Sequence, residues 1–259
     1  MIMADTLHGK FVRMLILLPP SETKSTGGTG KPLNLSGLTF PELNDVRQQI
    51  ADELVHLCRA GNEVQASKVL GLSEKLAGEI EENRQLFDSP TTPALSRYTG
   101  VLYDALEPDS LTDRARSRLA VGSALFGVIG GEGEIPHYRL SGGVKLNGAT
   151  LKSKWGKTIT EVLATRAEDD LVIDLRSGTY QQLGKLKGAV TVRVESVQPD
   201  GSRKVVSHFN KHYKGLLARE LASSRADATD IKKVKTIATQ AGFTMEDSPN
   251  NPNELVMVV

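Results

Sequence analysis

The stretch Phe11-Val-Arg-Met-Leu-Ile-Leu-Leu-Pro-Pro20 predicts a buried β-strand. Its apolar residues follow one another and do not alternate with polar ones, which is typical of a strand covered on both faces. Pro19 and Pro20 end the strand, because proline has no N–H to donate to a neighbouring strand. Leu171 to Leu175 has the same character and predicts a second fully buried strand.

The rest of the chain mixes helical and strand patterns. Helices are expected at 41–60, 73–87, 110–120, 155–167, 211–223 and 228–241. Strands are expected at 124–129, 137–140, 189–197, 203–208, 243–246 and 255–258. Asp200-Gly201 predicts a hairpin turn, because this pair accepts the positive φ that such turns need. No internal repeat or Pro/Gly/Ser linker divides the chain, so we expect one compact α+β (mixed α/β) domain with helices around a mixed sheet.

Composition is that of a globular protein. The chain has 259 residues, and 39% of them are hydrophobic, enough for a substantial core. No apolar run approaches the length of a membrane span, and Met1 to Arg13 lacks the apolar region and cleavage site of a secretory signal. We therefore expect a cytoplasmic protein without a membrane partner, with a monomer as the favoured oligomeric state.

Charge is balanced overall but unevenly distributed. The formal net charge is +1, so a nucleic-acid surface would need basic residues to gather on one face. Residues 203–235 carry nine Lys and Arg against three Asp and Glu, whereas 41–53 and 74–88 are acidic. The carboxyl-terminal part of the chain is therefore the first place to look for an anion-binding surface.

The segment Lys211-His-Tyr-Lys-Gly-Leu-Leu-Ala-Arg219 predicts a helix with an apolar face and a basic face. At about 100° per residue, the basic face carries Lys211, Lys214 and Arg219, and Gly215 lies in its middle. A glycine there would let an anion approach the backbone, which predicts a phosphate-binding face. The alternative is a solvated amphipathic helix whose glycine serves close packing.

Metal or cofactor binding is not expected. Cys58 is the single cysteine, lies in an apolar helical context and is interpreted as a buried structural thiol. His208 and His212 are four residues apart, but no third ligand is evident, so a metal site there is not favoured. We expect no cofactor and no metal.

Several blocks of sequence together carry a family resemblance. They are Met14-Leu-Ile-Leu-Leu-Pro-Pro-Ser-Glu-Thr-Lys24, Leu72-Ser-Glu-Lys-Leu-Ala-Gly78, Arg97-Tyr-Thr-Gly-Val-Leu-Tyr103, Tyr138-Arg-Leu140, Trp155-Gly156, Val172-Ile-Asp-Leu-Arg-Ser-Gly-Thr-Tyr180 and 211–219. In this order they resemble the YaaA family of peroxide-stress proteins over nearly the whole chain. The resemblance implies a YaaA-like domain over 14–259 and an extension over 1–13, which we expect to be disordered.

The resemblance also implies a function and a site. It implies a positively charged cleft, a helix-hairpin-helix element, binding to duplex or branched DNA, and a role in limiting iron-driven oxidative damage. By position, it assigns phosphate contacts to Lys24, Arg139, Lys211, Lys214 and Arg219. Thr179 stands where some members have an acidic residue, which leaves an acid/base role at that point in doubt.

Residues 62–86 fit the helix-hairpin-helix element best. Leu70-Gly71-Leu72 would form the turn, with Lys68 and Lys75 on either side of it. A turn of this kind can offer backbone N–H groups to a phosphate without reading base sequence. The second helix is acidic, however, so an ordinary structural helical hairpin is an equal alternative.

A different class of function is an enzyme acting on a phosphorylated small molecule or nucleotide in the same cleft. Polar residues at strand ends are typical of active sites, and Arg176, Ser177 and Tyr180 follow a predicted buried strand. Glu132 and Glu134 are further candidates, but no spacing specifies a reaction. The aromatic residues Tyr138, Trp155 and Tyr180 are interpreted as core residues in preference to base-stacking platforms.

Overall fold

The computed structural model describes residues 14–59, 61, 63–206 and 209–259. The predicted extension, 1–13, lies outside these residues. The main sheet consists of β1 (Met14–Leu18), β3 (Leu119–Ser123), β4 (Gly127–Gly130), β8 (Leu171–Asp174), β9 (Val190–Val197), β10 (Arg203–Val205), β11 (Thr244–Asp247) and β12 (Glu254–Val258). Short pairs are formed by β2 (Thr92–Pro93) with β5 (Glu134–Ile135) and by β6 (Lys145–Leu146) with β7 (Ala149–Thr150).

The sheet is parallel in its centre and antiparallel at its edges. Its order is β11-β12-β9-β8-β1-β3-β4, and β10 pairs with β9. Strands β12, β9, β8, β1 and β3 run parallel, whereas β4, β10 and β11 are antiparallel to their neighbours. Strand β1 lies between two parallel neighbours, with Ile16 opposite Leu119 on one side and Ile173 on the other. The predicted mixed sheet in an α+β fold is confirmed.

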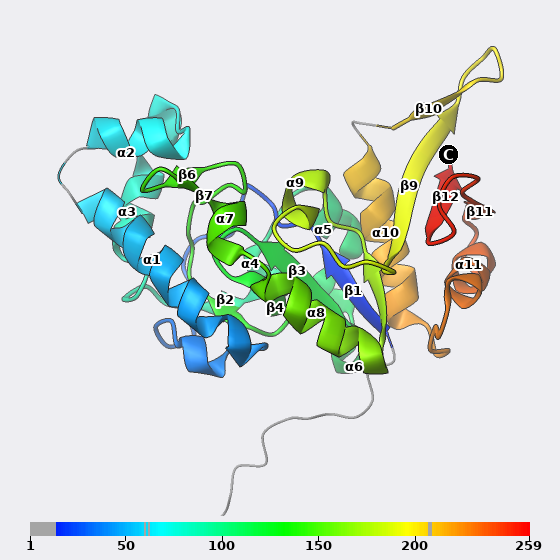
Figure 1. The fold of residues 1–259 in the computed structure, drawn as a ribbon, viewed down its shortest axis with the longest axis horizontal. Coiled ribbons are helices and arrows are strands. Elements are labelled where there is room, and N and C mark those ends of the chain that lie inside the picture. Colours follow the sequence, from blue (N-terminus) through cyan, green and yellow to red (C-terminus); the bar gives the residue numbers. More distant parts are fainter. Residues whose placement is uncertain (1–13, 60, 62, 207–208) are drawn as a thin grey trace, which may run out of the picture.

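Helices cover both faces of the sheet (Figure 1). They are α1 (Asn44–Arg59), α2 (Glu63–Leu70), α3 (Gly78–Arg84), α4 (Ala94–Arg97), α5 (Val101–Leu106), α6 (Asp113–Ser117), α7 (Leu151–Trp155), α8 (Thr158–Asp169), α9 (Gly178–Gln181), α10 (Asn210–Ser223) and α11 (Ile231–Gln240). In Figure 1, α8 lies in front of the sheet and α5 lies behind it, while α1, α2 and α3 lie together beyond the β4 side. No helix in the described ranges combines the length and apolar character needed to cross a bilayer.

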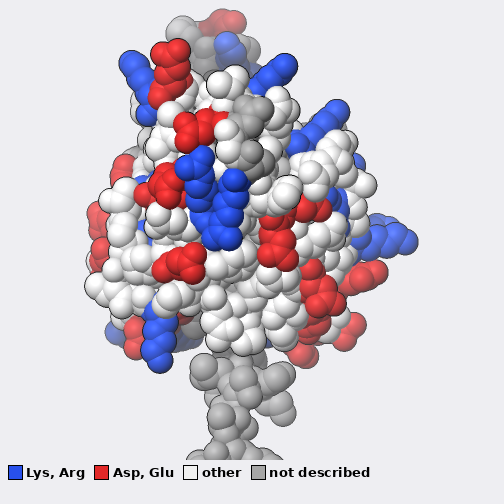
Figure 2. Space-filling view, turned by 90° about the vertical axis from the view of Figure 1, so that its left-hand side faces the viewer, with Lys and Arg blue, Asp and Glu red and all other residues white. Residues whose placement is uncertain are grey.

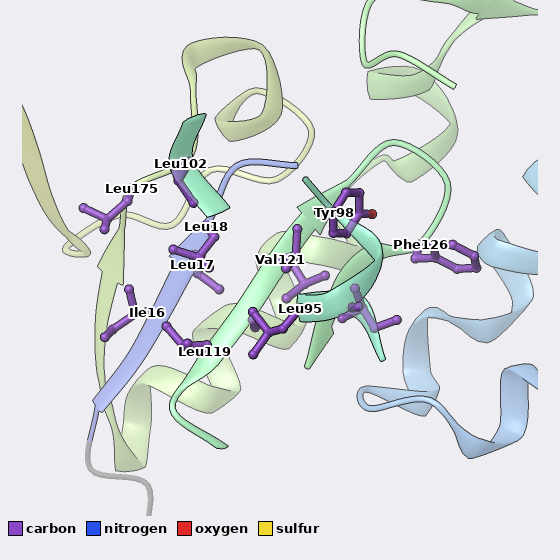
Figure 3. Packing of buried hydrophobic residues seen from close by; sticks show 14 of the residues in the cluster. Ile16, Leu17, Leu18, Leu95, Tyr98, Leu102, Leu119, Val121, Phe126 and Leu175 are labelled. Atoms are coloured by element: carbon purple, nitrogen blue, oxygen red, sulfur yellow. The ribbon is translucent and has the colours of Figure 1, made fainter. Parts of the chain in front are cut away.

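The core is built on the two strands expected to be buried. Every residue of β1 is buried, as are Val172 to Asp174 of β8. Figure 3 shows β1 and β3 side chains packed with Leu95 of α4 and Leu102 of α5. Trp155 is fully buried and donates from Nε1 to Ala124 O, so its interpretation as a core residue is confirmed.

Most predicted elements occur near their expected positions. The strand expected at 124–129 begins only at Gly127, and the helix expected at 155–167 is divided at Gly156 into α7 and α8. Three other elements also differ. The helix expected at 110–120 ends at Ser117, because Leu119–Ser123 pairs with β1 as a buried strand. Residues 137–140 form no strand, and 73–87 is divided into a 3-10 turn (Glu74–Leu76) followed by α3. In each case the pairing or packing of distant segments overrides the local pattern.

Fully buried arginines tie loops to the core. Arg97 donates from Nη1 to Ser25 O at 2.6 Å, from Nη2 to Gly27 O at 2.8 Å and from Nε to Ile135 O at 3.2 Å. Arg47 of α1 donates to Phe126 O and Val128 O, which attaches this helix to the β3–β4 turn. Such donors satisfy carbonyl groups that would otherwise be buried without partners.

Arg97→Met should lower the free energy of unfolding by about 3 kcal/mol, because several buried carbonyl oxygens lose their donor. The matched control is Arg225→Met, the same change at an exposed position, which should cost less than about 0.5 kcal/mol. Urea denaturation of both variants measures the difference. Equal losses would show that the Arg97 hydrogen bonds do not hold this loop.

Candidate functional site at the carboxyl edge of the sheet

Three parallel strands end next to one another at one edge of the sheet. Strand β1 leads into Ser21–Lys24, β8 leads into Arg176–Tyr180, and β3 ends at Ser123. In open sheets of this type, ligands bind outside the carboxyl ends of the strands. This edge is therefore the natural place to examine the predicted polar residues.

Lys24 lies in an aromatic environment at this edge. Its Nζ is 4.4 Å from the ring centroid of Tyr138 and 5.4 Å from that of Tyr98, and it donates to Ser21 O at 3.1 Å. Burial lowers the pKa of Lys24 to about 8, and the nearby Glu22 carboxylate opposes that shift only in part. The faces of aromatic rings attract an ammonium group, but they do not replace its lost hydration.

A chain of hydroxyl groups lies beside Lys24. Tyr138 Oη is 2.7 Å from Tyr98 Oη and 2.8 Å from Ser123 Oγ. Tyr103 donates to Pro19 O, and its ring stacks on Tyr98 with centroids 5.7 Å apart. Burial raises the pKa of Tyr98 to about 12 and that of Tyr138 well above its ordinary value. The phenols are therefore neutral and give Lys24 no negative partner.

Arg139 borders the same site. It forms an ion pair with Glu22 at 3.0 Å through Nη2, and its Nη1 donates to Glu22 O at 2.8 Å. Asn83 fixes its backbone by accepting from Arg139 N and donating to Arg139 O. The Nε of Arg139 is buried and has no hydrogen-bond partner. The structure thus brings the predicted residues Lys24 and Arg139 close enough for their charges to interact, with Glu22 acting on both.

The polar residues after β8 have mixed roles. Arg176 is buried and donates to Asp174 from Nε at 2.9 Å and from Nη2 at 2.8 Å, so its charge is already neutralised. Ser177 is exposed, and Tyr180 Oη accepts from Gly142 N at 3.3 Å. Burial raises the pKa of Tyr180, with Glu22 adding to the shift. Tyr180 therefore lies near the Lys24 site, whereas Arg176 supports the fold.

The basic side chains of α10 do not form a single solvent-exposed face. Lys211 is exposed, but Lys214 donates to Leu175 O at 3.2 Å, and burial lowers its pKa. Arg219 donates to Leu106 O at 2.9 Å and to Ser110 Oγ at 2.7 Å. Leu106 is the last residue of α5, and Ser110 ends the 3-10 turn that follows it. Two of the three predicted cations thus bind parts of the protein itself.

The expectation that Gly215 lies in the middle of an exposed basic face is wrong. Gly215 is buried where α10 packs against α5, and a Cβ at this position would lie 2.3 Å from Leu102 O and 2.9 Å from Ala105 Cβ. The glycine therefore permits close approach of the two helices, which was the packing alternative.

The predicted helix-hairpin-helix segment forms a helical hairpin. Helix α2 ends at Leu70, Gly71 turns the chain with φ 65°, and the 3-10 turn and α3 follow. Lys68 and Lys75 are both exposed on either side of this turn. A cavity of about 200 Å³ lies between the hairpin and the loop after Lys24, lined by Thr26, Lys75, Leu76, Gly78, Glu79, Glu82 and His137.

His137 joins this hairpin to the Lys24 loop. Its Nδ1 is 3.0 Å from Ser25 O and its Nε2 is 2.9 Å from Glu79 Oε2. Both nitrogens face acceptors, so the doubly protonated ring fits best. The hydrogen bond with Glu79 raises the pKa of His137 and lowers that of Glu79.

Within the described residues, no group of three or more His, Cys, Asp or Glu side chains could hold a metal ion. His208, one member of the spacing considered for a metal, lies outside the described residues. Cys58 is buried, as expected for a structural thiol, and burial raises its pKa.

Comparison with known proteins identifies the family. A sequence model described as "Peroxide stress protein YaaA" matches residues 14–248. The chain belongs to the YaaA family. A UPF0246 protein of Corynebacterium efficiens is 58% identical over 95% of this chain and its own full length, and one of Corynebacterium glutamicum is equally similar. A UPF0246 protein of Streptomyces coelicolor is 46% identical over 82% of this chain and 84% of its own.

Several residues of the site in this YaaA-family chain were not found from the sequence. Tyr98 and Tyr103 stood in a block that carries the resemblance, but nothing local indicated that the rings of Tyr98 and Tyr138 lie against Lys24, with Tyr103 stacked on Tyr98. Ser123 lay inside no recognised pattern. The pairing of His137 with Glu79 spans 58 residues and left no local signal.

Gly215→Ala should lower the free energy of unfolding by about 1–3 kcal/mol, because the added methyl overlaps Leu102 O. At an open helical position the same change would be neutral or favourable by up to about 1 kcal/mol. Gly78→Ala in α3, where no atom lies within 4 Å of the added Cβ, is the matched control. Stability unchanged in Gly215→Ala would contradict the packing role.

Stability should depend on pH through His137. A raised folded pKa means that the stabilisation by protonated His137 is complete below the unfolded pKa near 6.5 and is lost as pH rises through the folded value. Urea denaturation at pH 6 and pH 9 should therefore show that His137→Asn costs roughly 1–2 kcal/mol at pH 6 and less at pH 9. A cost independent of pH would show that His137 is not charged in the folded protein.

Proposed function

We propose that this protein binds DNA through the sugar–phosphate backbone and thereby limits iron-driven damage during peroxide stress. Membership of a peroxide stress family gives the biological setting. The observation that carries the proposal is the pair of exposed lysines, Lys68 and Lys75, on either side of the Gly71 turn. Cations beside a helical turn can contact phosphates without reading bases.

The charge around the hairpin limits how many phosphates can be neutralised. Glu63, Glu74 and Glu81 are close to the same lysines in sequence. Figure 2 shows this side of the molecule with Lys and Arg side chains interspersed with Asp and Glu, so that the basic atoms form small groups and no continuous surface. We therefore expect few phosphate contacts and a weak dependence of affinity on salt.

Further cations at the carboxyl edge support the same proposal to different degrees. Lys211 is exposed at the start of α10, and Arg139 has a partly open side chain beside Lys24. Lys214 and Arg219 already donate to main-chain carbonyls, so we assign them a smaller part in phosphate binding. Convergence of these groups on a single cleft stays a prediction.

A second candidate function is an enzyme acting on a phosphorylated small molecule or nucleotide. The Lys24 environment favours it, because a buried amine, neutral phenols and Arg139 gather at the carboxyl ends of parallel strands. Perturbed ionisable groups in such a position are typical of active sites. Arg176, bound to Asp174, is not available for such chemistry.

Replacing Lys68 and Lys75 together by Ala should weaken binding to unrelated duplexes about equally and flatten the slope of log affinity against log salt by about one to two. Electrophoretic shifts on duplex, single-stranded and branched DNA at several salt concentrations measure both quantities. The matched control is the double change of Lys157 and Lys187, two exposed lysines outside the hairpin, to Ala.

An equal loss in the control variant would remove the hairpin from the binding surface. A strong preference of the unchanged protein for one sequence over scrambled duplexes would contradict backbone recognition.

A further inference from the structure

We propose that Lys24 is a nucleophilic amine that forms an imine with the aldehyde of a sugar phosphate bound at the carboxyl edge of the sheet. The inference deepens the second candidate function and, where the sugar phosphate is part of DNA, rests on the proposed DNA binding. It starts from the position of Lys24, directly after a buried parallel strand and beside the ends of two others.

The Lys24 amine forms no ion pair, and the carboxylates of Glu22 and Glu79 only partly offset the effect of burial on its pKa. Its Nζ donates to the uncharged Ser21 O and otherwise lies over the faces of two tyrosine rings. No carboxylate of the described residues is within ion-pair distance of it, whereas the nearby Arg139 forms an ion pair with Glu22. An ion pair would hold the amine as ammonium, so its absence here leaves the lone pair available.

The protonation equilibrium of Lys24 is consistent with the lack of an ion pair. With burial lowering the pKa of Lys24 to about 8, about a tenth of the amine is neutral at pH 7, against well under a thousandth for an ordinary lysine. Only the neutral amine attacks a carbonyl carbon, and lysines of this kind serve in imine-forming enzymes. As a residue, Lys24 is partly exposed, although its amine is largely removed from water.

The reaction balances without an oxidant or reductant. The Nζ lone pair forms a bond to the aldehyde carbon, and a proton moves from the nitrogen to the carbonyl oxygen to give a neutral carbinolamine. The hydroxyl then takes a second proton from solvent and leaves as water, while the nitrogen lone pair forms the C=N bond of the iminium ion. The neutral hydroxyls of Tyr98 and Tyr138 add no negative charge that would hold the amine as ammonium.

Arg139 supplies the recognition of a phosphate. Its guanidinium already binds one exposed anion, Glu22, and its buried Nε has no partner. A phosphate in place of the Glu22 carboxylate would accept from the same Nη2, and the unpartnered Nε on the same side of a planar guanidinium is a second donor suited to paired recognition of oxyanions. A sugar phosphate could thus be bound by Arg139 while its aldehyde faces Lys24.

Two sources provide this chemistry, an abasic site in DNA and a free sugar phosphate. The experiment therefore incubates the full-length protein either with a duplex containing one abasic site or with deoxyribose 5-phosphate, and adds sodium borohydride to reduce any imine to a stable secondary amine. Intact mass and peptide mapping then locate the adduct. Variants are Lys24→Arg, which keeps the positive charge, and Lys157→Arg as the control at an exposed lysine outside the proposed binding surfaces.

We expect an adduct on Lys24 in the unchanged protein. The total amount of adduct should fall at least about tenfold in Lys24→Arg and be unchanged in Lys157→Arg. Its rate of formation should rise with pH through about 8, following Lys24. Adducts from either source on Lys24 support the inference and identify the substrate. Adducts spread over surface lysines and equal in Lys24→Arg, or none at all, would overturn it.

The two proposals fail in different ways. Shift assays on an intact duplex measure DNA binding without any aldehyde. A Lys24 adduct with deoxyribose 5-phosphate in a protein that does not bind the duplex would reject DNA binding and retain the imine. Duplex binding with no Lys24 adduct from either source would retain DNA binding and reject the imine. A thermal denaturation midpoint of Lys24→Arg equal to that of the unchanged protein excludes misfolding as the cause of a lost adduct.

Discussion

The parallel pairing of β1 with β3 on one side and β8 on the other is the constraint on which the site depends. It brings the end of β1 together with the ends of two strands that each lie more than 100 residues later in the sequence, because parallel neighbours end at the same edge of the sheet. The Pro19-Pro20 pair then directs the chain out of the sheet toward Lys24. Without this pairing, Lys24, Ser123 and Tyr180 would share no environment.

The buried basic residues of this protein have different roles, according to the hydrogen-bond and ionic partners that each one has. Arg97 and Arg176 are buried and fully bonded, so they hold the loop after Lys24 and the segment after β8 in place. Lys24 is also largely removed from water but has no anionic partner. A cation with paired hydrogen bonds stabilises a fold, whereas one that has lost hydration without compensation has a changed reactivity.

Sequence patterns predicted the buried strands and the long helices, because their periodicity is local. The apolar run at Met14–Leu18 and the helix at Asn210–Ser223 are examples. Local patterns failed where a distant partner determined the outcome. Leu119–Ser123 forms a strand because it pairs with β1. Gly215 was assigned to anion binding because its packing partner, Leu102, is 113 residues away in sequence and gives no local signal. Lys24 and Arg139 were chosen through family resemblance, but the tyrosines around Lys24 needed the fold.

The central claim is that the fold makes Lys24 an amine that is partly neutral near physiological pH. An NMR titration of the Lys24 side chain, assigned by comparison with Lys24→Arg, measures this directly. We expect a midpoint at about 8, well below the ordinary value of 10.5, because burial among Tyr98 and Tyr138 removes water and the nearby Glu22 carboxylate offsets that loss only in part. A midpoint near 10.5 would show that the amine is solvated or paired, and would contradict the account.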